Sequence, residues 1–88
     1  MNIYVINQSM EEYRRISDEI SKQCLITRIR SLSDPKCIAE CDDFDDVRMV
    51  IVSEGMYDIR KADIVHLRDR LPEKVKMLVE SDGGYMCI

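Results

Sequence analysis

The most apolar run of the chain opens the segment Met49-Val50-Ile51-Val52-Ser53-Glu54-Gly55-Met56, in which four consecutive apolar residues are followed by polar residues and a glycine. A short, unbroken apolar run of this kind is typical of a strand that is covered on both faces, as in a parallel sheet. We therefore expect a central strand over residues 49–52. Two further runs, Ile3 to Ile6 and Val75 to Val79, predict two more buried strands.

A helix is expected directly after the first of these strands. Ser9 is a preferred N-cap residue, and Glu12, three residues later, completes a capping box. Beyond the cap, apolar residues recur at steps of three and four, which places them on one face of an amphipathic helix. The residues of this stripe are Met10, Tyr13, Ile16, Ile20 and Cys24.

A second helix is expected between the central strand and the strand at Val75. Asp58 could cap its N-terminus, and Leu71-Pro72 ends it, because proline disfavours helical geometry in the residue before it. Its inward face is predicted to carry Ile64, Leu67 and Leu71, widened by Ile59 and Ala62.

The remaining segments give weaker signals. Leu25 to Arg30 predicts an edge strand, because its arginines can reach water there and discourage a further strand. Ser33-Asp34-Pro35 can start a short helix. Asp82-Gly83-Gly84 is a turn signal, and Tyr85 to Ile88 is long enough only for a short last strand. The sequence leaves open whether that strand pairs within its own subunit or with another.

Strands that alternate with helices predict right-handed crossovers and a mostly parallel sheet. We expect residues 1–88 to form a single α/β domain, a small three-layer, flavodoxin-like sandwich with four or five strands. The first, third and fourth strands should be central and the second at an edge. In such a sheet the ligand crevice lies beyond the carboxyl ends of the strands, where the strand order reverses. The residues expected to line it are Asn7, Gln8, Ser53, Glu54 and Ser81.

Composition bounds the classes of function. Eighty-eight residues, 45% apolar and 34% charged, suit one compact domain. The net charge of −4 argues against a nucleic-acid binder, because neutralising phosphates supplies most non-specific affinity. No apolar run approaches the roughly 20 residues that span a bilayer, so we expect no membrane attachment. Four cysteines without a secretion signal read as reduced thiols, which suggests a cytoplasmic protein.

The chain resembles the receiver domains of response regulators from Asn2 to about Ser81. The segment Asp46 to Met56 is similar to the receiver strand that carries the phosphoacceptor aspartate and, three residues later, a methionine. Ser53 stands at the position of that aspartate, and Met56 matches the methionine. The resemblance implies a receiver-like fold that lacks its phosphoacceptor.

Other receiver positions differ as well. Asn7-Gln8 lies where a receiver keeps its acidic pair for magnesium. Ser81, or Glu80 in another register, lies near the switch serine or threonine of the family. The family's final lysine has no counterpart, and only Tyr85 to Ile88 remain after Gly84, so the helix expected between the last two strands is missing.

These departures matter because of the chemistry that a receiver performs. Phosphoryl transfer to a receiver requires a carboxylate nucleophile and a magnesium ion held by further carboxylates. An asparagine, a glutamine and a serine make a poor magnesium site, and Ser53 has no neighbouring base in the sequence. We therefore expect no enzymatic activity and no cofactor.

Cysteine and histidine give little support for a metal or catalytic site. Cys37 and Cys41 would share one face of a helix and could take zinc, but further ligands would have to come from Cys24, Cys87 or His66. The alternative is that the thiols are small buried apolar groups. His66, the only histidine, has no serine or cysteine at catalytic spacing and is expected at the surface. We therefore expect no bound metal.

An acidic run precedes the central strand. It could bind calcium, imitate nucleic-acid phosphates or dock on a basic partner, but the glycine and distal glutamate of a calcium loop are absent. A solvated loop is the simpler interpretation. As candidate partner-binding residues the run contains Asp42, Asp43, Phe44, Asp45 and Asp46.

Two hypotheses for the function follow. The first is a non-catalytic regulatory module that binds another protein, or itself as a homodimer, through a helix and strand face within Asp58 to Val79. The second is a small inhibitor or accessory protein of the kind that phages and mobile elements encode, whose acidic run occupies a basic site on a host protein. Neutralising the four aspartates of the run would spare the first function and abolish the second. A third possibility, an enzyme or metal-dependent switch, would need the cysteines or the predicted crevice to bind an ion or nucleotide.

Overall fold

The computed structural model describes residues 2–22, 28–34, 47–81 and 84–88. Most of the predicted short helix after Ser33 lies outside the described residues, as do Cys24, Cys37 and Cys41. The elements follow one another as β1 (Asn2–Ile6), α1 (Met10–Ser21), β2 (Arg28–Leu32), β3 (Val47–Val52), α3 (Glu54–Ile59), α4 (Lys61–Arg70), β4 (Lys76–Ser81) and β5 (Gly84–Cys87).

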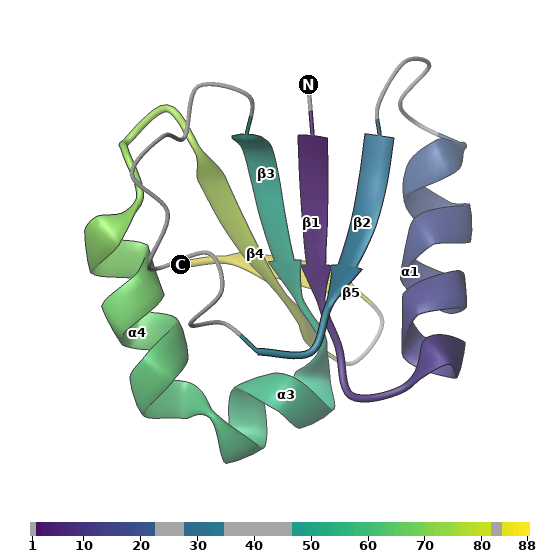
Figure 1. Cartoon of the computed structure of the whole chain (residues 1–88), viewed down its shortest axis with the longest axis horizontal. Coiled ribbons are helices and arrows are strands. Elements are labelled where there is room, and N and C mark those ends of the chain that lie inside the picture. The colour runs from purple at the N-terminus through teal and green to yellow at the C-terminus, as the bar shows by residue number, and fades with distance from the viewer. Residues whose placement is uncertain (1, 23–27, 35–46, 82–83) are drawn as a thin grey trace.

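The five strands form one sheet in the order β2-β1-β3-β4-β5 (Figure 1). β1 pairs in parallel with both β2 and β3, and β3 pairs in parallel with β4. β5 is antiparallel to β4 of its own chain. The α/β class, the mostly parallel sheet and the edge position of β2 are thus confirmed. The sheet is mixed, and the described residues contain three helices.

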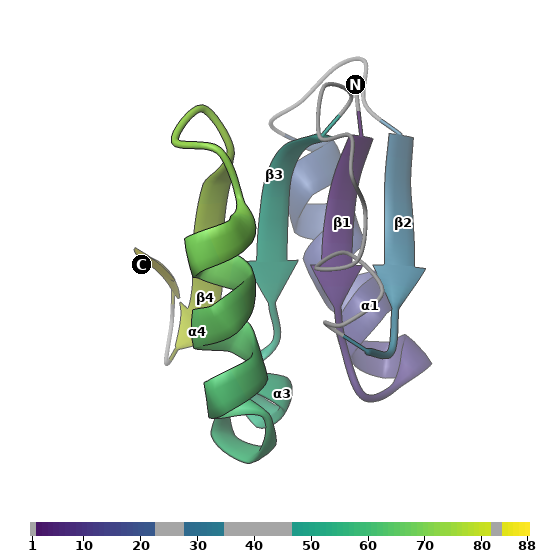
Figure 2. The same ribbon diagram turned by 60° about the vertical axis from the view of Figure 1, so that its left-hand side comes forward.

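Helices lie on both faces of the sheet, which gives three layers (Figures 1 and 2). One core lies between the sheet and α1, and Ile16 and Ile20 of that helix are buried in it. The other lies between the sheet and α3 and α4, with Met56, Ile64 and Leu67 as helical contributors. The alternation of side chains along each strand supplies both cores, because successive residues point to opposite faces.

Helix α1 begins where the sequence predicts. Ser9 Oγ accepts a hydrogen bond from Glu12 N, and the Glu12 carboxylate accepts one from Ser9 N, so the capping box is complete. Met10 was predicted on the inward stripe but is 57% exposed. The reason is its place in the first turn, which extends beyond the ends of the strands (Figure 1).

The predicted start of the second helix is wrong. Ser53, not Asp58, is an N-cap, because its hydroxyl follows β3 directly and accepts a hydrogen bond from Met56 N at 3.2 Å. Asp58 lies inside α3. The chain then breaks at Arg60, whose φ of −124° and ψ of 33° are not helical, before α4 begins.

The break also corrects the predicted apolar face. Arg60 binds Asp63 at 2.7 Å and Asp34 at 2.9 Å, so the junction between the two helices is tied to the end of β2. Ile64, Leu67 and Leu71 are buried as predicted, whereas Ile59 is 63% exposed and Ala62 is also exposed. The change of helix axis at Arg60 takes Ile59 and Ala62 off the inward face.

Candidate functional site

The parallel register brings the ends of β1 and β3 together. Ile6 pairs with Val52, so Asn7 and Ser53 follow at neighbouring strand ends, and Ser53 N donates to Ile6 O at 2.9 Å. This is where the predicted crevice lies. The structure divides the five predicted crevice residues into two groups with different surroundings.

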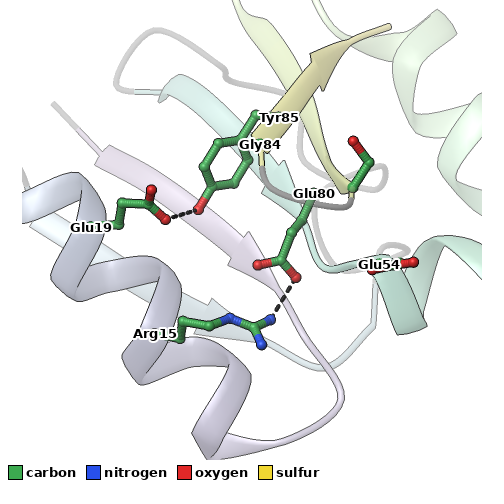
Figure 3. Close-up of a pocket in the computed structure, with 7 residues that line it drawn as sticks. Arg15, Glu19, Glu54, Glu80, Gly84 and Tyr85 are labelled. Atoms are coloured by element: carbon green, nitrogen blue, oxygen red, sulfur yellow. Dashed lines mark hydrogen bonds and ion pairs between the residues drawn. The ribbon is translucent and has the colours of Figure 1, made fainter.

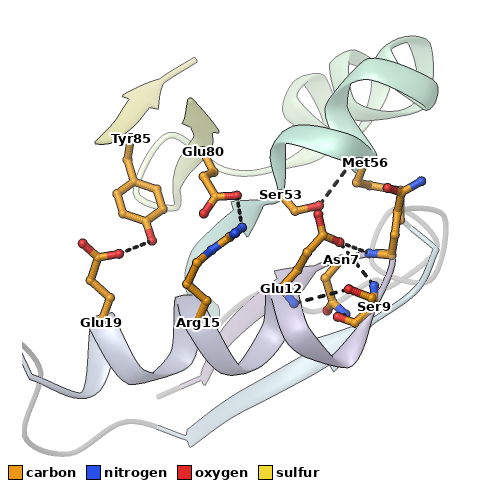
Figure 4. Close-up of polar contacts among 10 residues, drawn as sticks. Asn7, Ser9, Glu12, Arg15, Glu19, Ser53, Met56, Glu80 and Tyr85 are labelled. Carbon is orange, nitrogen blue, oxygen red and sulfur yellow. Dashed lines mark hydrogen bonds and ion pairs between the residues drawn. The ribbon is translucent and has the colours of Figure 1, made fainter. Parts of the chain in front are cut away.

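Asn7 serves the packing of the strand ends. It is 4% exposed. Its Nδ2 donates to Ser9 O at 2.8 Å (Figure 4). Its Oδ1 accepts a hydrogen bond from Ser31 Oγ at 2.8 Å. The Asn7 backbone N–H donates to Leu32 O at 3.0 Å. Asn7 therefore joins the end of β1 to β2 and to the start of α1, with both the nitrogen and the oxygen of its amide hydrogen-bonded.

Ser53 is also committed to the backbone. It is fully buried, and its hydroxyl is the acceptor that caps α3 (Figure 4). An ionised side chain at this position would lie in a site without water, where charge is costly unless it is paired. Ser53 is thus a structural cap.

Gln8 lies over the first turn of α3. Its backbone N–H donates to Glu12 Oε1 at 2.8 Å. A Cβ atom added to Gly55 would stand 2.3 Å from Gln8 Oε1, so the Gln8 side chain packs against the glycine in the first turn of α3. The space beside Gly55 is filled by the end of the Gln8 side chain, which would have to move if a larger residue replaced the glycine.

Glu54 and Ser81, the other two predicted residues, line a cavity of about 360 Å³. Figure 3 shows it bounded by α1, the end of β4 and the start of β5. The remaining lining residues, which the sequence reasoning did not identify as a site, are Arg15, Glu19, Glu80, Gly84 and Tyr85.

Two polar contacts cross this cavity between α1 and the β4–β5 hairpin. Arg15 Nη2 binds Glu80 Oε1 at 2.6 Å, and Tyr85 Oη donates to Glu19 Oε2 at 3.0 Å (Figure 3). The Glu80 side chain is only 14% exposed, so its ion pair is partly shielded from solvent, whereas Arg15 is 59% exposed. These contacts anchor the hairpin to the helix.

Burial raises the pKa of Tyr85 well above its ordinary value, and the hydrogen bond to Glu19 and the charges of Glu19 and Glu80 act in the same direction. The Arg15 charge opposes them. The phenol is therefore held neutral as a donor, which is the opposite of what a tyrosine nucleophile or base requires. Among the described residues, no cluster of His, Cys, Asp and Glu side chains is arranged to hold a metal ion.

The site could have been predicted from the sequence if the last strand had been assigned as the antiparallel neighbour of β4. Glu80 pairs with Tyr85 across β4 and β5, so both side chains point to the face that α1 covers. Helical spacing places Arg15 and Glu19 one turn apart on α1. Sequence reasoning missed the site because it did not establish which strand the last segment pairs with.

Several other predicted residues stand apart from this site. His66 is exposed on α4, and Cys87 is an exposed free thiol. The acidic run with its candidate partner-binding residues, Asp42, Asp43, Phe44, Asp45 and Asp46, lies outside the described residues. None of the helices in the described ranges is both long and apolar enough to cross a membrane.

Large apolar side chains are exposed at a few positions. On the side of the sheet that carries α3 and α4, Ile59 is 63% exposed, Val65 48% and Met86 50%. Exposed apolar groups that gather on one face are a feature of binding surfaces, whereas single ones are ordinary.

Comparison with models of known families, with curated proteins and with solved structures found no match for this chain. What the chain shows is a small α/β domain with a mostly parallel sheet of five strands.

Proposed function

We propose that this chain is a non-catalytic, regulatory protein-interaction module, built on a receiver-like sheet that has no phosphoacceptor. The observation that carries the proposal is the use made of Asn7 and Ser53. Both are buried, and their polar side-chain atoms bind the backbone or Ser31. At the positions where a receiver has its reactive residues, Asn7 and Ser53 instead stabilise the ends of strands and the start of a helix.

The receiver-like assignment of the fold is part of the same proposal. It is supported by the parallel strands β2-β1-β3-β4 and by a polar residue directly after both β1 and β3. The hairpin at the C-terminal side departs from a receiver. Only residues 82 and 83 separate β4 from β5, so a crossover helix cannot fit there and β5 runs antiparallel.

The interaction surface is proposed on the side of α3 and α4. Ile59 and Val65 expose apolar side chains there, and Met86 of β5 does so on the same side of the sheet. Lys61, at the start of α4, lies over the ring of Tyr57 in α3, at 5.6 Å from its centroid. Apolar anchors within a polar rim are typical of transient protein interfaces.

Site-specific photocrosslinking in the native host tests this proposal and separates it from the acidic-run inhibitor. A photoreactive amino acid replaces Val65 on the proposed surface, Asp43 in the acidic run, or Asp18 on the solvent side of α1 as a matched control. We expect protein adducts from position 65 and none from position 18. Adducts from position 43 alone would favour the inhibitor, and the absence of any protein adduct would contradict an interaction module.

The absence of catalysis is tested on the purified chain by intact mass after incubation with magnesium and acetyl phosphate. We expect no covalent change. A phosphoryl adduct that disappears in Ser53→Ala would overturn the non-catalytic assignment and place the chemistry at the end of β3.

A further inference from the structure

The outer edge of β5 has backbone groups that no strand of the described residues binds. Ile88 N donates to Met77 O at 3.0 Å, which makes residues 77 and 88 a hydrogen-bonded pair. In an antiparallel ladder such pairs alternate with non-bonded ones. In the same register, the N–H and C=O groups of Gly84 and Met86 point toward β4. Those of Tyr85 and Cys87 therefore point away from β4, toward the open edge of the sheet.

The two edges of the sheet differ in their protection. β2 exposes Arg28 and Arg30, and a row of like charges discourages a second copy from pairing there. The described residues of β5, Gly84-Tyr85-Met86-Cys87, carry no formal charge. Self-pairing at β5 therefore places no like charges directly opposite one another.

Apolar side chains flank this edge on one side. Arg68 Nε donates to Ile88 O at 2.9 Å, so the side of α4 that carries Arg68 lies beside the end of the chain after β5. Val65 precedes Arg68 by three residues and shares its side of the helix. Val65 and Met86, each about half exposed, thus border the β5 edge.

Charges at the two ends of the hairpin have opposite signs. Arg68 and Lys76 lie near its open end, at the C-terminal end of β5 and the start of β4. Near its turn, the cavity that Gly84 also lines holds three carboxylates and one cation, so its side chains carry a net negative charge although Arg15 pairs with Glu80. A two-fold axis across β5 brings the basic end of one copy toward the acidic end of the other, which is the complementarity that orients encounters.

We propose that a second copy of this chain binds at the β5 edge, so that the two sheets continue into one another through antiparallel β5 strands. The register that uses both outward-facing residues places Tyr85 opposite the partner's Cys87 and Cys87 opposite the partner's Tyr85, each pair exchanging two hydrogen bonds. Met86 then faces the partner's Met86 across the two-fold axis. This interface deepens the proposed function, because it names a second copy of the chain as the first partner of the module. It rests on the proposed function in that both assign the chain a binding role.

Sedimentation equilibrium of the full chain, under reducing conditions, tests the interface. A short strand with two flanking side chains is a small contact, so the concentrations should extend from roughly micromolar to millimolar. We expect a reversible dimer in the wild type. A chain that stays monomeric over this whole range would overturn the proposal.

Two substitutions locate the contact. Cys87→Pro removes an outward N–H that β4 does not use, and Met86→Lys sets like charges against each other at the axis. We expect each to weaken dimerisation by about tenfold or more, equivalent to about 1.4 kcal/mol. Met10→Lys, an equally exposed methionine on α1, is the matched control and should leave the dimer intact. Wild-type dimerisation in both β5 variants, with folding verified by circular dichroism, would contradict the edge contact.

A disulfide tests the register. Directly opposed, non-hydrogen-bonded residues have Cα atoms about 4.5 Å apart, within the range of a disulfide. Met86→Cys in a Cys87→Ser background should therefore form a covalent dimer on mild oxidation. Native Cys87 and the partner's Cys87 would be offset by two residues, roughly 8 Å apart, so the wild type should not cross-link there. Cross-linking through Cys87 and not through position 86 would refute this register.

The outcomes also separate this inference from the proposed function. A chain that stays monomeric and takes no phosphoryl adduct would contradict the dimer and would remain consistent with the interaction module. A phosphoryl adduct would end the non-catalytic assignment whatever the oligomeric state.

Discussion

At the scale of single residues, Asn7 has a structural role at the ends of the strands. Its Nδ2 donates to the Ser9 carbonyl and its Oδ1 accepts from Ser31, so both ends of the amide are needed. An aspartate has the same shape but no donor when ionised. It would set a negative oxygen against the Ser9 carbonyl in a buried place.

Asn7→Asp should therefore destabilise the fold by about 1–3 kcal/mol at neutral pH. Because burial and the facing carbonyl disfavour the ionised form, the folded-state pKa of the new carboxyl is raised above its unfolded value. The penalty is present above that folded-state pKa and declines as the pH falls through it. Urea unfolding of variant and wild type at neutral and acidic pH measures the difference. Asn2→Asp, at the half-buried start of β1, is the control, and an equal or smaller loss at position 7 would contradict the role given to Asn7.

Tyr85 gives a prediction in alkaline solution. Its pKa is raised in the folded chain, first by burial and then by Glu19, so the unfolded state loses this proton at lower pH than the folded state does. The contribution of Tyr85 to stability is full below the ordinary tyrosine pKa of about 10 and is lost as the pH rises toward the folded-state value. Tyr85→Phe should cost about 0.5–1.5 kcal/mol at neutral pH through the lost hydrogen bond.

The same variant should remove one late step from the tyrosinate absorbance titration, which reports all four tyrosines. A difference titration between wild type and Tyr85→Phe that shows a midpoint near or below the ordinary value would contradict the buried, donating phenol.

At the scale of elements, the start of α3 gives a direct comparison. Ser53 caps that helix from the end of β3, whereas Asp58 lies inside it. Ser53→Ala should cost about 1 kcal/mol, within the usual range of 0.5–2 kcal/mol for a lost cap. Asp58→Ala should change the free energy of unfolding by less than about 0.5 kcal/mol. Chemical denaturation measures the free energy of unfolding of both variants. A larger loss of stability in Asp58→Ala than in Ser53→Ala would contradict Ser53 as the N-cap and support a helix that begins at Asp58.

The elements differ in how far local sequence determines them. Met49 to Val52 and the capping box at Ser9 are local signals that agree with the fold, so β3 and the start of α1 follow from the sequence. The break at Arg60 does not, because its backbone conformation is accompanied by ion pairs to Asp63 and to Asp34, 26 residues away. A contact of that range leaves no periodic trace in the sequence.

The same reasoning explains which parts of the site were predictable. Asn7 and Ser53 were identified because parallel strand ends meet at one edge of a sheet. Their hydrogen bonds were not predictable, since they depend on how closely the chain packs after each strand. The cavity was missed because Glu80 and Tyr85 come together only through the antiparallel pairing of β4 and β5.

At the scale of the whole molecule, the sheet ends in an edge strand that is suited to the proposed role in binding. The uncharged β5 edge, the half-exposed Val65 and Met86 beside it, and the structural use of Ser53 point in the same direction. A small domain has little stability to spare, so covering exposed apolar surface with a partner also favours its folded state.

Native mass spectrometry of the full chain under reducing conditions, with and without magnesium and a small phosphodonor, is the decisive measurement for a non-catalytic binding module. We expect a dimer in equilibrium with monomer, and identical masses in both samples after the ions are stripped. A stoichiometric phosphoryl adduct on the chain would contradict the non-catalytic role.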